Sequence, residues 1–282
     1  MCRTPRSAVL LIALATWFAT AHTLAQAPAN SPPSGPELTR DEMRQFLLTA
    51  KVTKSRDIGK GVTRPLRLTL TNGTLTHDGA FQSVDEVGRF ENLRGTGGVG
   101  AELSMVDAYR YNLAAESLAV ALGLQDMVPV HVERRWNGRV GALSWWVDTL
   151  MDEAERRQKG VEPPNADAWN RQMYRMRVFA ALVRDTDRNL GNVLITPDWR
   201  IVMIDFTRAF RIQPLLGDTA SLPRCDRALL TRMQGLTADG VKQIVKEQLT
   251  PAEIESVLKR RDLLVTHFQQ LALKRGEAAV YY

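Results

Sequence analysis

The stretch Asp185-Thr-Asp-Arg-Asn-Leu-Gly-Asn192 decides the fold of this chain. A segment with apolar residues at helical spacing precedes it, and two short apolar runs, 193–195 and 201–204, follow it. The Thr-Pro-Asp sequence between these runs is typical of a turn. The pattern therefore predicts a helix, a polar loop and a β-hairpin, with Asp205 directly after the second strand.

This arrangement suits phosphoryl transfer to a hydroxyl group. That reaction needs a carboxylate near the incoming nucleophile and two oxygen ligands for the metal ions on the nucleotide phosphates. Asn192 follows Asp187 by five residues, and Asp205 follows Asn192 by thirteen. We therefore predict Asp187 as the catalytic carboxylate, Asn192 and Asp205 as metal ligands, and ATP with Mg²⁺ as cofactors. In the competing interpretation, Asp187 and Asn192 only cap a helix and shape a turn.

Two other stretches match known binding motifs only in part. Asp185-x-Asp187-x-Asn189 begins like a calcium-binding EF-hand loop, but Leu190 stands where that loop needs Gly and Thr196 where it needs Glu. The sequence Gly95-Thr-Gly-Gly-Val-Gly100 matches a dinucleotide-binding pattern, which requires a buried strand just before it. The preceding residues are too polar for such a strand, so we predict a flexible loop at 95–100.

The C-terminal half resembles the catalytic region of atypical kinases, namely phosphatidylinositol kinases, HipA-like bacterial kinases and kinases of the animal secretory pathway. Those families have an Asp-Arg-His-x-x-Asn loop, and here Asn189 replaces the His in Asp187-Arg188-Asn189-Leu190-Gly191-Asn192. The segment Ile204-Asp205-Phe206-Thr207 resembles their metal-binding motif, with Thr207 where conventional protein kinases have Gly. The chain has no Ala-Pro-Glu segment, which also favours the atypical branch.

The order of elements predicts an α+β fold. Strands are expected at 46–53, 64–71 and 74–82, a long helix at 104–123, and a hairpin whose turn is Trp136-Asn-Gly-Arg139. The remainder is mostly helical, and Thr250 and Glu253 form a capping box that opens a helix ending near Gly276. The resemblance implies a two-lobed kinase-like fold, with a small β-rich N-lobe at 38–148 and a helical C-lobe at 149–282.

The resemblance also assigns parts of a nucleotide site. The loop with Gly59, Lys60 and Gly61 would lie over the phosphates, and residues 145–148 would form the hinge beside the adenine. Kinases usually carry a Lys on the third strand paired with a Glu on the helix. Here Gln82 is the best match for the Lys, while Asn112 fits the Glu position in one register and Glu116 in another.

Because the usual Lys–Glu pair is absent, two functions remain open, and a third is less favoured. We expect an atypical phosphotransferase that moves a phosphoryl group from ATP to a protein or small-molecule acceptor, with Lys60 and Gln82 as phosphate contacts. The alternative is a pseudokinase that binds a nucleotide or protein partner without catalysis. A third interpretation is a module of the cell envelope with no nucleotide site.

The N-terminal residues have the features of a secretory signal peptide. Two arginines precede an apolar stretch that is too short for an ordinary membrane span, and small-residue cleavage sites follow. We predict cleavage near Ala25, a flexible leader at 26–37 and a periplasmic or secreted protein; a retained anchor is the alternative. Cleavage lowers the formal charge from +6 to +4, which does not suggest nucleic-acid binding, and leaves Cys225 as the only thiol. No membrane span is expected in the mature chain.

Overall fold

The computed structural model describes Met1 and residues 38–59, 65–87 and 106–282. Several predictions lie outside the described residues: the signal peptide beyond Met1, the leader, the contacts of Lys60 and Gly61, and the loop expected at 95–100. Leu38–Tyr282 forms one compact unit, and it is this unit that the following paragraphs concern.

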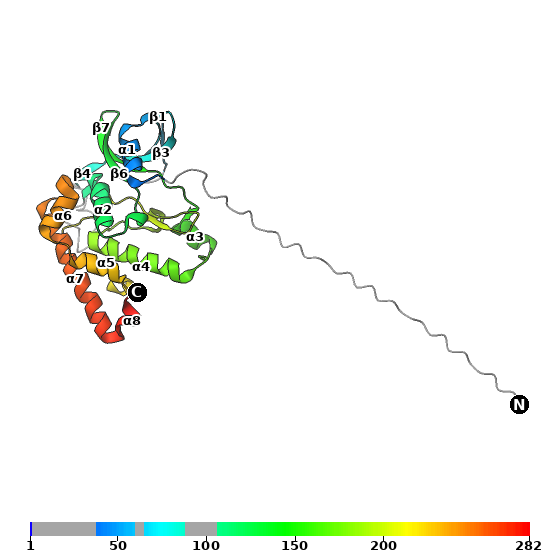
Figure 1. Ribbon diagram of the computed structural model, residues 1–282, viewed down its shortest axis with the longest axis vertical. Coiled ribbons are helices and arrows are strands. Elements are labelled where there is room, and N and C mark those ends of the chain that lie inside the picture. The colour runs from blue at the N-terminus through cyan, green and yellow to red at the C-terminus, as the bar shows by residue number, and fades with distance from the viewer. Residues whose placement is uncertain (2–37, 60–64, 88–105) are drawn as a thin grey trace, which may run out of the picture. The chain divides into compact units, whose positions relative to one another are not determined.

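A five-stranded antiparallel sheet dominates the N-terminal part of this unit (Figure 1). Its spatial order is β1 (Lys51–Asp57), β2 (Leu66–Thr71), β3 (Thr76–Gln82), β7 (Arg139–Trp145) and β6 (His131–Trp136). The predicted tight turn at Trp136-Asn-Gly-Arg139 is confirmed. Asn137 and Gly138 between β6 and β7 both have positive φ, at 48° and 79°, as a type I′ hairpin turn requires.

A helix replaces the first predicted strand. Helix α1 (Arg40–Thr49) contains Phe46 and Leu47, which are buried against the sheet, and β1 begins only at Lys51. The prediction of a strand at 46–53 is therefore wrong over its first half. The apolar run at 46–48 fits a strand and a helix equally well, whereas a capping box between Thr39 and Glu42 fixes the helix start.

The long helix expected at 104–123 is shorter than predicted. Residues Val106–Ala108 form strand β5, which pairs antiparallel with β4 (Asp85–Val87), and α2 spans only Arg110–Ala121. Helix α2 is buried on nearly all sides, including at the polar residues Asn112 and Glu116. Gly123, just beyond its end, has φ 73°, in agreement with the predicted glycine at the helix terminus.

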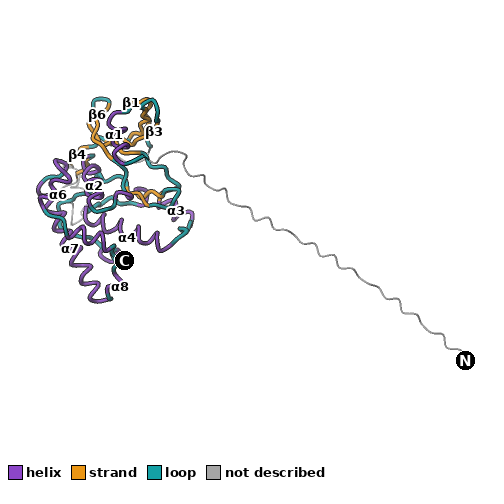
Figure 2. Tube along the Cα trace, in the orientation of Figure 1, coloured by secondary structure: helices purple, strands orange, loops and turns teal. Residues whose placement is uncertain are grey.

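The C-terminal part is mainly helical (Figure 2). A small sheet, in the order β10 (Ile201–Met203), β9 (Val193–Ile195) and β8 (Met151–Asp152), holds the predicted hairpin. The helices of this part are α3 (Glu153–Lys159), α4 (Ala166–Val183), α5 (Arg227–Gln234), α6 (Ala238–Val245), α7 (Pro251–Arg275) and α8 (Glu277–Val280). Short 3-10 turns lie at Gln125–Met127, Leu190–Asn192, Thr219–Ser221 and Lys246–Gln248.

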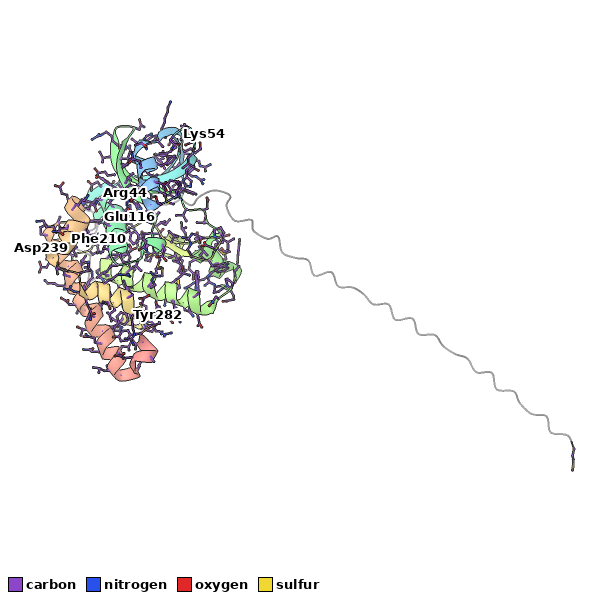
Figure 3. The ribbon with its side chains drawn as sticks, viewed as in Figure 1. Arg44, Lys54, Glu116, Phe210, Asp239 and Tyr282 are labelled. Atoms are coloured by element: carbon purple, nitrogen blue, oxygen red, sulfur yellow. The ribbon has the colours of Figure 1, made fainter. Side chains whose placement is uncertain are left out.

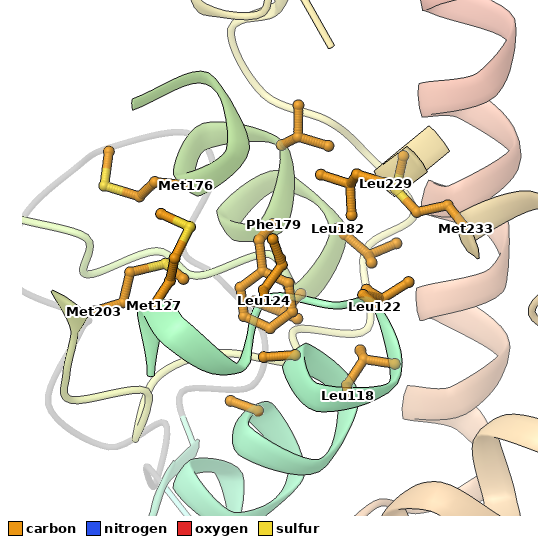
Figure 4. Packing of buried hydrophobic residues seen from close by; sticks show 14 of the residues in the cluster. Leu118, Leu122, Leu124, Met127, Met176, Phe179, Leu182, Met203, Leu229 and Met233 are labelled. Atoms are coloured by element: carbon orange, nitrogen blue, oxygen red, sulfur yellow. The ribbon is translucent and has the colours of Figure 1, made fainter. Parts of the chain in front are cut away.

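The larger hydrophobic core joins α2 to the C-terminal helices. Leu118 of α2 and Leu122, directly after its end, pack close to Phe179 and Leu182 of α4 (Figure 4). The predicted capping box of Thr250 and Glu253 opens α7, which stops before Gly276 as expected. Within the described ranges, no helix combines the length and apolar character needed to cross a membrane.

Candidate functional site

The loop after α4 is held in shape by a buried ion pair. Arg184 ends the helix in the left-handed conformation, and the side chain of the next residue, Asp185, is fully buried and paired with Arg188. Arg188 Nη1 donates to the carbonyl oxygens of Asn192 (2.9 Å) and Ile204 (2.5 Å). Burial raises the pKa of Asp185, although the positive charge of Arg188 opposes that shift. This brace fixes the loop against the hairpin; sequence reasoning did not identify it.

Asp187 and Asn192 lie on one side of this loop. Asn192 Nδ2 donates to the Asp187 carbonyl at 3.1 Å, and Asn189 Oδ1 accepts from the Gly191 amide at 3.0 Å. The turn-shaping roles of the competing interpretation are thus present. They use the amide nitrogen of Asn192, so its Oδ1 is the atom that suits a cation.

Asp205 follows β10 in a left-handed conformation, with φ 57°. Its Oδ1 accepts from Gln82 Nε2 at 3.1 Å and from Thr207 Oγ1 at 3.0 Å. A left-handed φ is uncommon for residues other than Gly, although Asp adopts it more readily than most. Gln82, the last residue of β3, is therefore joined directly to the predicted metal ligand.

A relay of side-chain amides continues from Gln82. Gln82 Oε1 accepts from Asn112 Nδ2 at 2.8 Å, and Asn112 Oδ1 accepts from the Phe206 amide at 2.8 Å. The neutral pair of Gln82 and Asn112 therefore connects β3, α2 and the Asp205 loop. It occupies the place where the resemblance implies a Lys–Glu ion pair.

Glu116 lies outside this relay. Its carboxylate is paired with Arg40 (2.6 Å) and Arg44 (2.7 Å) of α1 and accepts from the His131 amide at 2.9 Å. Arg44 and Glu116 lie close together where α1 meets α2 (Figure 3). Of the two registers predicted for α2, it is Asn112 that meets Gln82, while Glu116 anchors α1.

These elements enclose a cavity of about 670 Å³. Asp187, Asn192 and Asp205 line it, and so do Trp145, Trp146 and Val147 of the expected hinge. Gln82 also lines the cavity, whereas Asn112 and Glu116 are not among the lining residues. The structure thus brings the three predicted catalytic and metal-binding residues to one cavity.

The loop expected to cover the phosphates is only partly described. Gly59 has φ 72° and donates its amide hydrogen to Asp57 Oδ1 at 2.7 Å. Ile58 and Pro65, which flank this segment in the sequence, both line the cavity. The two ends of the loop therefore lie at the site. Lys60 and Gly61, predicted to contact phosphates, lie outside the described residues.

The cavity wall is strongly acidic. Five lining side chains are carboxylates: Asp107, Asp152, Glu155, Asp187 and Asp205. Arg208 is the only Lys or Arg among the described lining residues, and it donates to Asp107 Oδ2 (3.0 Å) and Asp187 Oδ2 (3.3 Å). Sequence reasoning missed Asp107 and Arg208 because they are 101 residues apart and no spacing rule links them.

The donor set suits a magnesium ion shared with a nucleotide. Among the residues that the structure describes, no three His, Cys, Asp or Glu side chains are grouped so that they could hold a metal on their own. Magnesium in nucleotide sites is usually bound by one or two carboxylates, with phosphate and water oxygens completing its coordination. Asp205, with Asn192 Oδ1 as a second oxygen donor, meets that requirement.

Comparisons with known proteins agree with the geometry at the level of the fold. No protein-family model and no curated protein matches the chain. A Fam20 protein of hydra, solved with a sugar, is 12% identical with a TM-score of 0.61, covering 86% of this chain and 91% of that one. The Golgi casein kinase, solved with manganese and ADP, is 11% identical with a TM-score of 0.57, covering 86% of this chain and 78% of that one. The predicted two-lobed, atypical kinase-like fold is confirmed.

Proposed function

We propose that this protein is a phosphotransferase that binds ATP together with a divalent metal ion, Mg²⁺ in the first instance, in the acidic cavity. The observation that carries the proposal is that Asp187, Asn192 and Asp205 line one cavity with the hinge residues. The kinase-like fold supports it, and so does the nucleotide and metal in the Golgi casein kinase structure.

Each residue has a distinct role in this proposal. The hinge at Trp145–Val147 would hold the adenine of ATP. Asp205 and Asn192 would hold the metal ion that neutralises charge on the phosphates. Asp187 would orient the acceptor hydroxyl and take up its proton. Gln82 would fix the carboxylate of Asp205 through the 3.1 Å hydrogen bond.

A pseudokinase is the second candidate, and a specific observation favours it. The Gln82–Asn112 pair is neutral, so it can hydrogen-bond to a phosphate but cannot offset its charge. Such a site could bind a nucleotide or position a partner without turnover. Transfer and binding must therefore be measured separately.

The deciding experiment compares wild type with Asp187→Asn and Asp205→Asn. Thermal melting with ATP and Mg²⁺ or Mn²⁺ measures binding, since a ligand at 100 times its Kd adds roughly 2.7 kcal/mol of stability. ADP production and incorporation of labelled phosphate measure transfer.

We expect Asp205→Asn to lose most of the metal-dependent stabilisation. Asp187→Asn should keep that stabilisation and lose transfer. Binding without transfer in wild type would favour the pseudokinase. The lack of any nucleotide effect in wild type would refute the phosphotransferase and leave only a protein that positions a partner.

A further inference from the structure

The acidic cavity poses an electrostatic problem for a nucleotide. A triphosphate would enter a space lined by five carboxylates, and the third-strand lysine that usually offsets its charge is replaced by Gln82. Two divalent ions would offset only part of this charge, because the negative charges of the carboxylates add to those of the triphosphate. A protein cation close to the phosphates is therefore needed.

Arg208 is the cation that the described part of the cavity offers. It lies three residues after Asp205, and its side chain is 28% exposed, so it contacts both solvent and cavity. Burial lowers the pKa of Arg208, but its hydrogen bond to Asp107 and the charges of Asp107, Asp187 and Asp205 outweigh that effect and raise it. The guanidinium therefore interacts electrostatically with Asp205, the proposed metal ligand, as well as with its hydrogen-bond partners Asp107 and Asp187.

The backbone around Arg208 is fixed, whereas its side-chain contacts are exchangeable. Its carbonyl accepts from Thr186 Oγ1 at 3.3 Å, and the preceding Thr207 carbonyl accepts from the Ala108 amide at 2.9 Å. Both side-chain contacts are single hydrogen bonds, of which the one to Asp187 is the longer, at 3.3 Å against 3.0 Å. The guanidinium can therefore leave Asp187 while Asp107 retains Nε.

Given the proposed function, we infer that Arg208 is the phosphate-binding cation of this site and replaces the missing lysine. When ATP binds with its metal, the Arg208 guanidinium exchanges Asp187 for the terminal phosphate. Arginine suits this role because its planar donors pair with phosphate in a fixed geometry. Asp107 stays beside the guanidinium, and its negative charge competes with the phosphate for it.

The exchange also releases Asp187. In the described structure its Oδ2 accepts a hydrogen bond from Arg208 Nη1 at 3.3 Å. Movement of Arg208 to the phosphate would leave Asp187 free to contact the acceptor hydroxyl. Nucleotide binding and acceptor binding would then be coupled through one side chain.

The test measures the affinities of ATP, ADP and AMP, each with Mg²⁺, by calorimetry on the whole protein. Arg208→Gln is compared with Asp107→Asn and with the control Arg110→Gln. Arg110 is a matched control because its side chain is also 28% exposed and pairs with one carboxylate, Asp85 at 2.7 Å, yet it does not line the cavity.

We expect Arg208→Gln to weaken ATP roughly 10- to 100-fold, as loss of a hydrogen bond between charged groups does. The effect should be smaller for ADP and absent for AMP, which lacks the terminal phosphates. Asp107→Asn should have the opposite sign and tighten ATP, because it removes a negative charge and loosens Arg208. Arg110→Gln should change none of the three affinities.

A purely structural clamp gives a different pattern. In that case Arg208→Gln and Asp107→Asn would shift affinity in the same direction and by the same factor for all three nucleotides, and the inference would be overturned. Unchanged ATP affinity in Arg208→Gln would also overturn it while leaving the proposed function standing. If the wild type binds no nucleotide with metal, the proposed function fails and this inference fails with it.

Discussion

Gln82 Nε2 lies 3.1 Å from Asp205 Oδ1, so the last residue of the third strand touches the predicted metal ligand directly. A lysine at this position would form an ion pair, whereas the amide both donates to Asp205 and accepts from Asn112. Gln82 is uncharged, so it holds Asp205 in place without offsetting the negative charge that would attract a cation. The relay therefore supports the carboxylate.

Gln82→Leu should expose this support role. The substitution removes both hydrogen bonds and leaves Asn112 Nδ2 and Asp205 Oδ1 each short of a partner, at a cost of about 1–3 kcal/mol. Urea unfolding measures that loss, and melting with ATP and Mg²⁺ should show a smaller stabilisation than in wild type. Unchanged unfolding free energy would mean that the relay contributes nothing to the fold.

Glu116→Gln should destabilise the junction between α1 and α2. The buried carboxylate holds Arg40 and Arg44, and because both arginines are partly exposed we expect a loss of about 1–3 kcal/mol. Glu255→Gln is the matched control, since Glu255 pairs with Lys259 on an exposed helix surface. The control should leave the unfolding midpoint unchanged, and equal effects of the two substitutions would contradict the assignment.

Stability should decrease as the pH falls below about 6.5. Burial lowers the pKa of His131 from its ordinary value of 6.5, with Glu116 and the Pro129 carbonyl opposing the shift. Below pH 6.5 the unfolded chain therefore binds a proton more readily than the folded chain, and acid favours unfolding until the folded pKa is reached.

Melting temperatures between pH 5 and pH 7 measure this effect. His131→Gln should show a smaller decrease than wild type, and the remaining decrease is expected from His77, whose pKa burial also lowers. The same pH profile in wild type and His131→Gln would rule out His131 as the source.

Gly141→Ala should disturb the site by pushing β3, which carries Gln82, away from β7. A Cβ atom at Gly141 would lie 2.4 Å from the Gln82 carbonyl oxygen and 2.9 Å from the Phe81 ring, so β3 and β7 would have to separate. We expect a loss of about 1–3 kcal/mol and weaker nucleotide binding. Gly235→Ala, whose nearest neighbour would be at 3.5 Å, serves as the control and should be tolerated in both assays.

The N-terminal sequence predicts export, and N-terminal sequencing tests it. A basic residue pair, an apolar stretch and small residues before Gln26 should direct cleavage near Ala25, so that the mature chain begins at or close to Gln26. Material from the periplasm or medium should show that start. Recovery of exported protein that still begins at Met1 would contradict the prediction.

The sequence could place those residues of the candidate site whose positions depend on neighbouring residues. Asp187 and Asn192 share one short loop, and Asp205 returns to it through a hairpin of two three-residue strands, so local spacing suffices. Gln82 could be placed because it ends the expected third strand, which forms β3 and pairs antiparallel with the preceding strand β2.

The parts that were missed depend on partners far along the chain. Arg44 and Glu116 are 72 residues apart, and Arg208 and Asp107 are 101 apart, so neither pair leaves a periodic signal. Tertiary contacts decided both of these cases. Helix α1 was missed for a different reason: the apolar run at Phe46 is ambiguous, and the local signal that resolves it, the capping box of Thr39 and Glu42, was overlooked.

Trp145 and Trp146, the tryptophans of the proposed hinge, give the cavity an intrinsic fluorescence signal. Trp145 stacks on the His77 ring at 3.8 Å, and the Arg67 guanidinium lies 3.9 Å from the centre of the Trp146 ring. Both indoles line the cavity, whereas Trp136, Trp169 and Trp199 do not. A base that enters beside the hinge would change the polarity around these indoles. Intrinsic fluorescence should therefore follow occupancy of the site in real time, without an attached dye.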